Sequence, residues 1–167
     1  MAEIYKINTD LFGEIEVSQT DGLTEDYEIV LGGKNMTINL QIFENIVSDN
    51  TLKTVENMLN QIPQMYEKGK NAILDGIDSD DTIKSFIDFY LDAADDYYEI
   101  FDVDSSDEIT SAMIAEKLEP RNIFIATTKD NMIDCNFDFS LPEEYTDQLL
   151  VIRFDDNYEI YDISEES

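Results

Sequence analysis

The chain has 167 residues, of which 39 are acidic and 10 are basic, so its formal net charge is -29. It contains no histidine and a single cysteine, which excludes a Ser-His-Asp triad, a Cys-His nucleophile pair, a histidine-ligated zinc and an internal disulfide. So strong a negative charge also argues against direct binding to nucleic acid or to anionic membrane surfaces. Because 43% of the residues are apolar, we expect a single folded domain spanning residues 1–167 rather than a disordered chain.

The first part of the chain, residues 1–45, predicts strands. Apolar residues alternate with polar ones, and this period of two is typical of half-buried strands. Gly32 and Gly33 can both adopt positive φ, so we expect a tight hairpin that joins strands near residues 25–31 and 35–43. The alternating positions are Ile15, Val17, Tyr27, Ile29, Leu31, Met36, Ile38, Leu40 and Ile42.

The middle of the chain, residues 50–119, predicts three helices. The first follows a capping cluster at residues 49–51 and should be kinked or split by Pro63. The second begins after Ser79 and carries one apolar stripe at spacings of three and four residues: Ile83, Phe86, Ile87, Tyr90, Leu91 and Ala94. A third, shorter helix follows Asp107 and ends before Pro120, because proline disfavours the helical conformation in the preceding residue.

Alternation returns in residues 121–164, so we expect strands there. Cys135 lies on the apolar side of its strand, which predicts an inert core thiol. Strands, helices and strands in separate blocks favour an α+β fold: a mostly antiparallel sheet built from the N-terminal and C-terminal strands, with three central helices packed on one face.

The densest charge lies in residues 75–108, which hold thirteen acidic residues and one lysine. On the second helix Asp88, Asp92 and Asp96 are four residues apart and would share one edge opposite the apolar stripe. Carboxylates near the helix C-terminus, here including Asp95, oppose the helix dipole at a cost of about 0.3–1 kcal/mol each. Two interpretations stay open: a solvated face that keeps the protein soluble, and a surface for a cationic partner.

Aromatic residues follow these aspartates directly, and tyrosine is common in interface hot spots. The alternative is that Tyr97 and Phe101 continue the apolar stripe into the core, which we expect for at least one of them. The predicted partner-binding residues are Asp88, Asp92, Asp95, Asp96, Tyr98 and Asp102.

We expect no cofactor, no dedicated metal site and no catalytic residue. A loop starting at Asp102 has the alternate acidic spacing of an EF-hand, but its sixth and twelfth positions are Asp107 and Met113 instead of Gly and Glu. Among 39 carboxylates, any chosen spacing of two carries almost no information about a catalytic pair. An enzyme that uses a carboxylate pair is therefore the weaker alternative to a non-enzymatic binding protein.

Both ends of the chain resemble a bacterial family of small acidic proteins of unknown function. The resemblance rests on residues 11–17 (LFGEIEV), the hairpin through residues 32–40, residues 146–155 (TDQLLVIRFD) and the final DISEES; the central helices are compatible with it. Such families are often encoded beside polymorphic or secreted toxins, and some members act as immunity proteins. The resemblance implies no catalytic residues, and the His or Trp that the family often carries in its first hairpin and helices is absent here.

We therefore expect a cytoplasmic, immunity-like or antitoxin-like inhibitor that masks a basic bacterial effector through residues 88–102. No apolar run approaches the length of a membrane span, and no signal segment is predicted. The rival interpretation is an acidic housekeeping or adaptor protein whose partner binds the sheet edge or the C-terminal residues 143–167.

Overall fold

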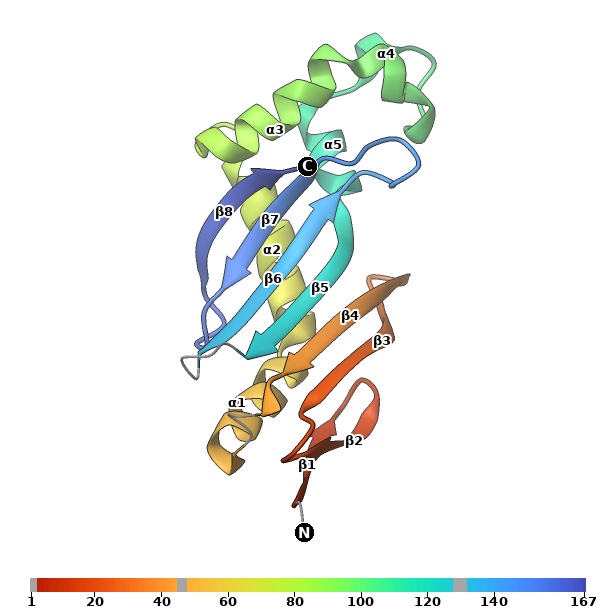
Figure 1. Ribbon diagram of the computed structural model, residues 1–167. Coiled ribbons are helices and arrows are strands. Elements are labelled where there is room, and N and C mark those ends of the chain that lie inside the picture. Colours follow the sequence, from red (N-terminus) through yellow and green to blue (C-terminus); the bar gives the residue numbers. More distant parts are fainter. Residues whose placement is uncertain (1–2, 45–47, 128–131) are drawn as a thin grey trace.

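Strands occupy both ends of the chain and helices occupy its middle in the computed structural model, which describes residues 3–44, 48–127 and 132–167 (Figure 1). The fold is therefore α+β, as the sequence predicted, and residues 1–2, 45 and 128–131 of the predicted strand blocks lie outside the described residues. The strands are β1 (Ile4–Thr9), β2 (Gly13–Ser18), β3 (Leu23–Leu31), β4 (Lys34–Ile42), β5 (Glu119–Thr127), β6 (Ile133–Ser140), β7 (Leu149–Phe154) and β8 (Ile160–Glu166).

Six strands form one sheet in the order β3-β4-β5-β6-β7-β8. All neighbouring pairs are antiparallel except β4 and β5, which run parallel with Thr37 opposite Asn122. A parallel pair needs a long crossover, and here the connection from β4 to β5 contains all the described helices.

The predicted hairpin at Gly32 and Gly33 is confirmed. β3 and β4 pair antiparallel up to Leu31 opposite Lys34, and the two glycines between them have φ values of 57° and 78°. Positive φ at both central residues matches the twist of the flanking strands, which is why glycine is favoured there.

The first strand, β1, is not predicted by the sequence pattern. It pairs with β2 in a separate two-stranded sheet, and its outer edge is covered by α1. The backbone amide of Asn8 donates to Glu56 Oε1 at 2.8 Å, and that of Asp10 donates to Asn60 Oδ1 at 2.9 Å. Helix side chains therefore satisfy backbone donors that another strand would otherwise bind.

The helices are α1 (Asp49–Asn60), α2 (Ile62–Gly76), α3 (Asp81–Asp92), α4 (Ala94–Tyr97) and α5 (Ser111–Lys117), with short 3₁₀ helices η2 (Tyr98–Ile100) and η3 (Ser106–Glu108). The predicted split at Pro63 is confirmed, because α1 ends at Asn60 and α2 begins at Ile62. The cap of α1 lies one residue earlier than predicted: Ser48 accepts a hydrogen bond from the amide of Thr51. No helix in the described ranges is both long enough and apolar enough to cross a bilayer.

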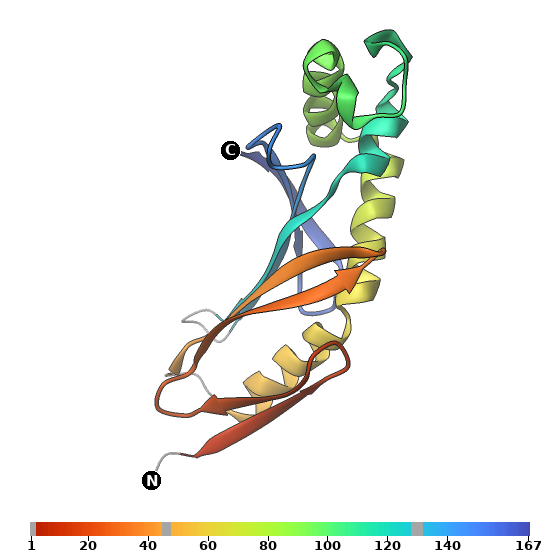
Figure 2. The same ribbon diagram turned by 90° about the vertical axis from the view of Figure 1, so that its right-hand side faces the viewer.

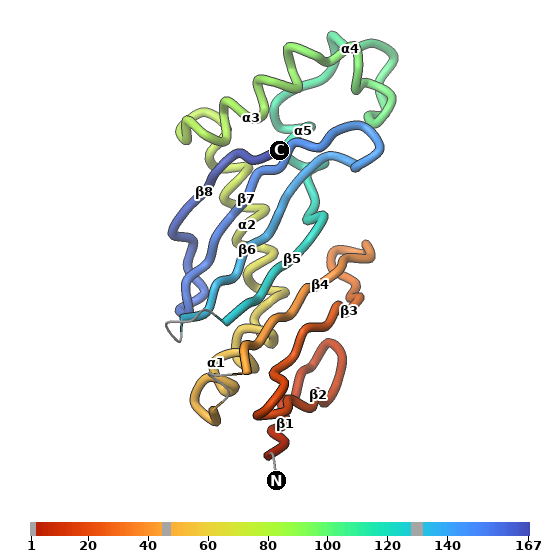
Figure 3. The backbone as a smooth tube through the Cα atoms, viewed as in Figure 1, coloured from red at the N-terminus to blue at the C-terminus, as the bar shows by residue number. Residues whose placement is uncertain are grey.

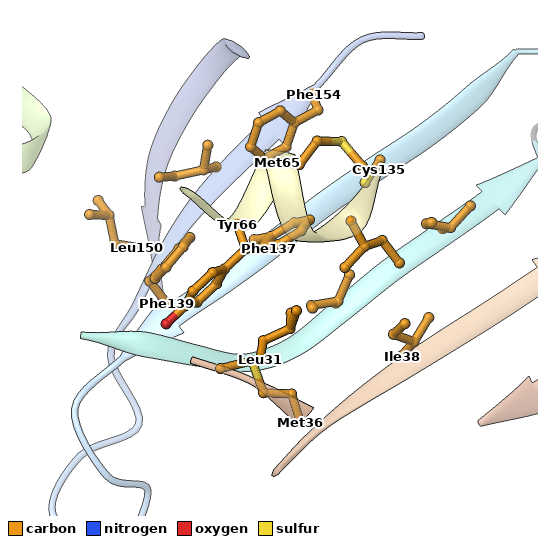
Figure 4. Close-up of a cluster of buried hydrophobic side chains, with 14 of the residues drawn as sticks. Leu31, Met36, Ile38, Met65, Tyr66, Cys135, Phe137, Phe139, Leu150 and Phe154 are labelled. Carbon is orange, nitrogen blue, oxygen red and sulfur yellow. The ribbon is translucent and has the colours of Figure 1, made fainter. Parts of the chain in front are cut away.

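Helix α2 runs along one face of the six-stranded sheet (Figure 2). The buried hydrophobic cluster includes residues of both and extends to β1, β2, α1, α3 and α5. In Figure 4, Met65 of α2 lies beside Phe154 and Cys135, and Tyr66 lies beside Phe137 and Phe139. A Cβ atom at Gly69 would come within 2.9 Å of the Phe139 ring, so glycine is what allows the helix to approach the sheet this closely.

Candidate functional site

The acidic residues of 75–108 gather from the last turn of α2 through α3 and α4 to the turns that follow, at the end of the molecule opposite β1 (Figures 1 and 3). We call this region the acidic tip. It holds Asp75, Asp78, Asp80, Asp81, Asp88, Asp92, Asp95, Asp96, Glu99, Asp102, Asp104, Asp107 and Glu108, with Lys84 as its one basic residue.

The apolar stripe of α3 fixes the tip to the rest of the protein. Ile83, Phe86, Ile87 and Tyr90 are buried, as the periodicity predicted. The Tyr90 hydroxyl shares a hydrogen bond of 3.0 Å with Thr146 Oγ1 in the loop between β6 and β7. The opposite face of α3 is therefore held in a defined position toward solvent.

The start of α3 explains one of the acidic residues as a helix cap. Asp80 accepts a hydrogen bond from the amide of Ile83 at 3.0 Å, and Asp81 lies in the first turn, where negative charge is favoured by the helix dipole. Asp80 and Asp81 therefore stabilise the start of α3, and this role accounts for their charge without a partner.

The prediction that Asp88, Asp92 and Asp96 share one edge of a single helix is wrong for Asp96. The helix ends at Asp92, Ala93 takes a non-helical conformation with φ -107° and ψ 26°, and Asp95 and Asp96 lie in the first turn of α4. The unfavourable dipole term therefore applies to Asp92 and not to Asp95 or Asp96.

Most of the predicted binding residues are exposed and have little compensation. Asp88 is half-buried and forms an ion pair with Lys84 at 2.6 Å, and Asp95 accepts a hydrogen bond from the Ser106 hydroxyl. The remaining three carboxylates, those of Asp92, Asp96 and Asp102, make no hydrogen bond or ion pair with any residue in the described ranges.

Two of the predicted residues converge on a third that the sequence did not single out. Asp92 and Asp95 line a hollow of about 310 Å³ together with Asp107 of η3. Asp96, Tyr98 and Asp102 do not line this hollow. The contribution of Asp107 depends on how the turns fold back toward α4, which spacing alone does not reveal.

The aromatic residues of the tip divide between core and surface. Phe101 is buried at 8% exposure, as we expected for at least one of the pair. Tyr97 is half-buried and packs edge-on against Tyr90, with ring centroids 5.0 Å apart. Tyr98 is 38% exposed and Phe89 is 49% exposed, so two aromatic side chains of the tip reach the surface. Phe89 lines a separate small hollow together with Gln148 and Glu165.

The sequence analysis did not identify Phe89 as a surface residue, although its position on the helix predicts that it is exposed. It lies between the stripe positions Ile87 and Tyr90 and is out of phase with the apolar stripe. A large aromatic at such a position is expected to face solvent.

The electrostatics of the tip favour cations. The hydrogen bond and charge of Asp88 raise the pKa of Lys84, with smaller contributions from Asp78 and Asp92. The same field would act on a lysine or arginine that a partner brings to this surface.

Nucleophilic chemistry has little support in the described residues. Cys135 is 1% exposed, and burial raises the pKa of its thiol well above the usual range, so the predicted inert core thiol is confirmed. No group of three or more His, Cys, Asp or Glu within the part of the chain that the structure describes is arranged to hold a metal ion.

Comparisons with protein-family models, with curated proteins and with solved structures found no match. The resemblance of the chain ends to a family of small acidic bacterial proteins therefore stays a prediction.

Proposed function

We propose that the protein is a non-enzymatic binding protein whose acidic tip masks a basic protein partner. The observation that carries the proposal is the combination of exposed, uncompensated carboxylates at Asp92, Asp96 and Asp102 with the exposed rings of Phe89 and Tyr98. Carboxylates attract and orient a cationic surface, and aromatic rings supply the buried contacts that slow dissociation.

The energetic cost of this surface supports the same proposal. Asp92 sits at the C-terminal end of α3, where its charge opposes the helix dipole. It forms no ion pair with a described residue, and Lys84, which pairs with Asp88, adds only a weak Coulombic attraction. A lysine or arginine of a partner would remove that penalty. The partner therefore needs a Lys-rich or Arg-rich surface with an apolar patch that accommodates two aromatic rings.

The class of partner follows from the resemblance and not from the geometry. An immunity-like role implies a basic bacterial effector whose active site or substrate groove is covered by the acidic tip. Inhibition would then require occupancy only, with no chemical step performed by this chain.

The test is to purify the chain together with a basic protein that binds it and to map the contact by hydrogen-deuterium exchange. Protection of residues 88–102 upon complex formation is the expected result. Protection confined to residues 143–167, insensitive to ionic strength, would contradict the proposal and favour an adaptor that binds through its sheet edge or C-terminal strands.

A further inference from the structure

A second concave site lies away from the acidic tip, where β4 and β5 begin and β6 ends. It is a cavity of about 330 Å³ with three cations in its wall, although the whole chain has only ten basic residues against 39 acidic ones. Its lining includes Lys34, Lys117 and Arg121 together with the apolar side chains of Pro120, Leu141 and Pro142. Apolar walls with a few converging charged groups are typical of small-molecule sites.

One of the two acids in this wall, Glu119, is already neutralised. Its Oε1 lies 3.2 Å from Lys70 Nζ and 3.5 Å from Lys34 Nζ, and its Oε2 accepts a hydrogen bond from Tyr66 at 2.6 Å. Lys70, which also donates to two backbone carbonyls, is enough to balance this one charge.

The remaining cations are only partly used. Lys117 forms no ion pair or hydrogen bond with any described residue. Besides Glu119, Glu143 is the one other acid in the lining of this cavity. Asp138 also lies close enough for its charge to act on Arg121. With Lys70 included, four cations face the three acids Glu119, Glu143 and Asp138, so these groups carry a small excess of positive charge. Charges further away than about 8 Å are largely screened at physiological salt.

Arg121 is placed by an irregularity in its strand. Pro120 pairs with Phe139 and Asn122 pairs with Asp138, so Arg121 is the extra residue of a β-bulge. Bulges often redirect a side chain beside a functional site.

The guanidinium of Arg121 has spare donors. Its Nη2 donates to the carbonyl oxygen of Thr146 at 2.7 Å, whereas its Nε is buried without a hydrogen-bond partner among the described residues. A buried donor without a partner is costly. An oxyanion in the cavity would bind the Nη groups, because Nε has no accessible surface and Nη1 makes no hydrogen bond with a described residue.

We infer that this cavity binds a small molecule through a carboxylate or phosphate group, with Arg121 and Lys117 as the principal contacts and Lys34 as a third cation. The proposal does not depend on the acidic tip, because no residue is shared between the two sites.

The experiment is an NMR titration of the full chain with inorganic phosphate and, separately, with succinate at constant ionic strength. The probes are the backbone amides around the cavity and the Nε-H signal of Arg121. The variants are Arg121→Gln and Lys117→Gln, and the matched control is Lys6→Gln, which removes one exposed lysine of β1. Lys117 is exposed and its side chain makes no hydrogen bond or ion pair with a described residue, so its variant is expected to fold even if Arg121→Gln does not.

The expected result is a saturable shift of cavity signals with one or both anions. Each cavity variant should weaken the binding about tenfold or more, as is usual for a lost charged hydrogen bond, and Lys6→Gln should leave it unchanged. A response to phosphate alone identifies a phosphate ligand, and a response to succinate alone identifies a carboxylate ligand. The inference is overturned if neither anion shifts these signals, or if the cavity variants bind as well as Lys6→Gln.

Discussion

The hydroxyl of Tyr66 on α2 donates a hydrogen bond of 2.6 Å to Oε2 of Glu119 at the start of β5. The same hydroxyl lies against the β3-β4 hairpin, since a Cβ atom at Gly32 would come within 2.6 Å of it. One contact thus joins the central helix, the hairpin and the strand that follows the crossover. Burial and the neighbouring Glu119 raise the pKa of Tyr66 well above its usual range, so this hydroxyl stays protonated and able to donate.

Tyr66→Phe should lower the free energy of unfolding by about 1–2 kcal/mol, because it removes a hydrogen bond to a charged acceptor while leaving the ring in place. Urea unfolding measures this as a lower midpoint with an unchanged slope. Tyr145→Phe is the matched control, because that tyrosine is exposed and its hydroxyl makes no hydrogen bond with the described residues. Equal stability of the two variants would show that the Tyr66 contact is not stabilising.

Asp138 predicts a pH dependence of stability. It is 7% exposed, and burial raises its pKa although the side-chain amide of Asn136 donates a hydrogen bond of 3.1 Å to its Oδ1. Because the folded-state pKa lies above the unfolded one, ionisation of Asp138 destabilises the fold. This penalty is fully present above the folded pKa and disappears below the ordinary aspartate value of about 3.9.

Asp138→Asn should therefore unfold at higher urea concentration than the parent chain at pH 7, and the gain should vanish as the pH falls below the ordinary aspartate range. Asp134→Asn removes an exposed carboxylate from the same strand and controls for net charge. A gain that is independent of pH, or equal in the two variants, would contradict the assignment to Asp138.

The two ends of α3 predict opposite effects of the same substitution. Asp92→Asn removes a charge from the unfavourable C-terminal end and should raise the free energy of unfolding by about 0.3–1 kcal/mol at low salt. Asp81→Asn removes a charge from the first turn and should lower it by a similar amount. Thermal unfolding at low and high salt checks both, and shifts of the same sign would show that net charge, and not the helix dipole, dominates.

Local patterns predicted the parts of the fold that depend on local chemistry. Gly32 and Gly33 specify the hairpin, Pro63 separates α1 from α2, and the stripe through Phe86 and Tyr90 places α3. In each case the determining residues lie within a few positions of the structure they produce.

Contacts between segments far apart in the chain were not predicted from the sequence. The parallel pairing of Thr37 with Asn122 joins segments far apart in the chain, and the bulge at Arg121 exists only because of that strand's partner, β6. Helix α3 ends before Ala93 although no proline or glycine lies near this position, so the sequence pattern did not predict the break. For this reason the sequence grouped Asp96 with Asp88 and Asp92, and the meeting of Asp92, Asp95 and Asp107 was not predicted.

The most direct test of the account is the rate at which the chain associates with the basic partner proposed above as salt is varied. The variant Asp88→Asn, Asp92→Asn, Asp96→Asn is compared with Glu16→Gln, Glu28→Gln, Asp156→Asn, which changes net charge equally at exposed positions outside the tip. Loss of steering from the tip should slow association about tenfold at low salt and flatten its salt dependence, with a much smaller effect in the control. Equal rates for the two triple variants would contradict a role for the acidic tip in binding.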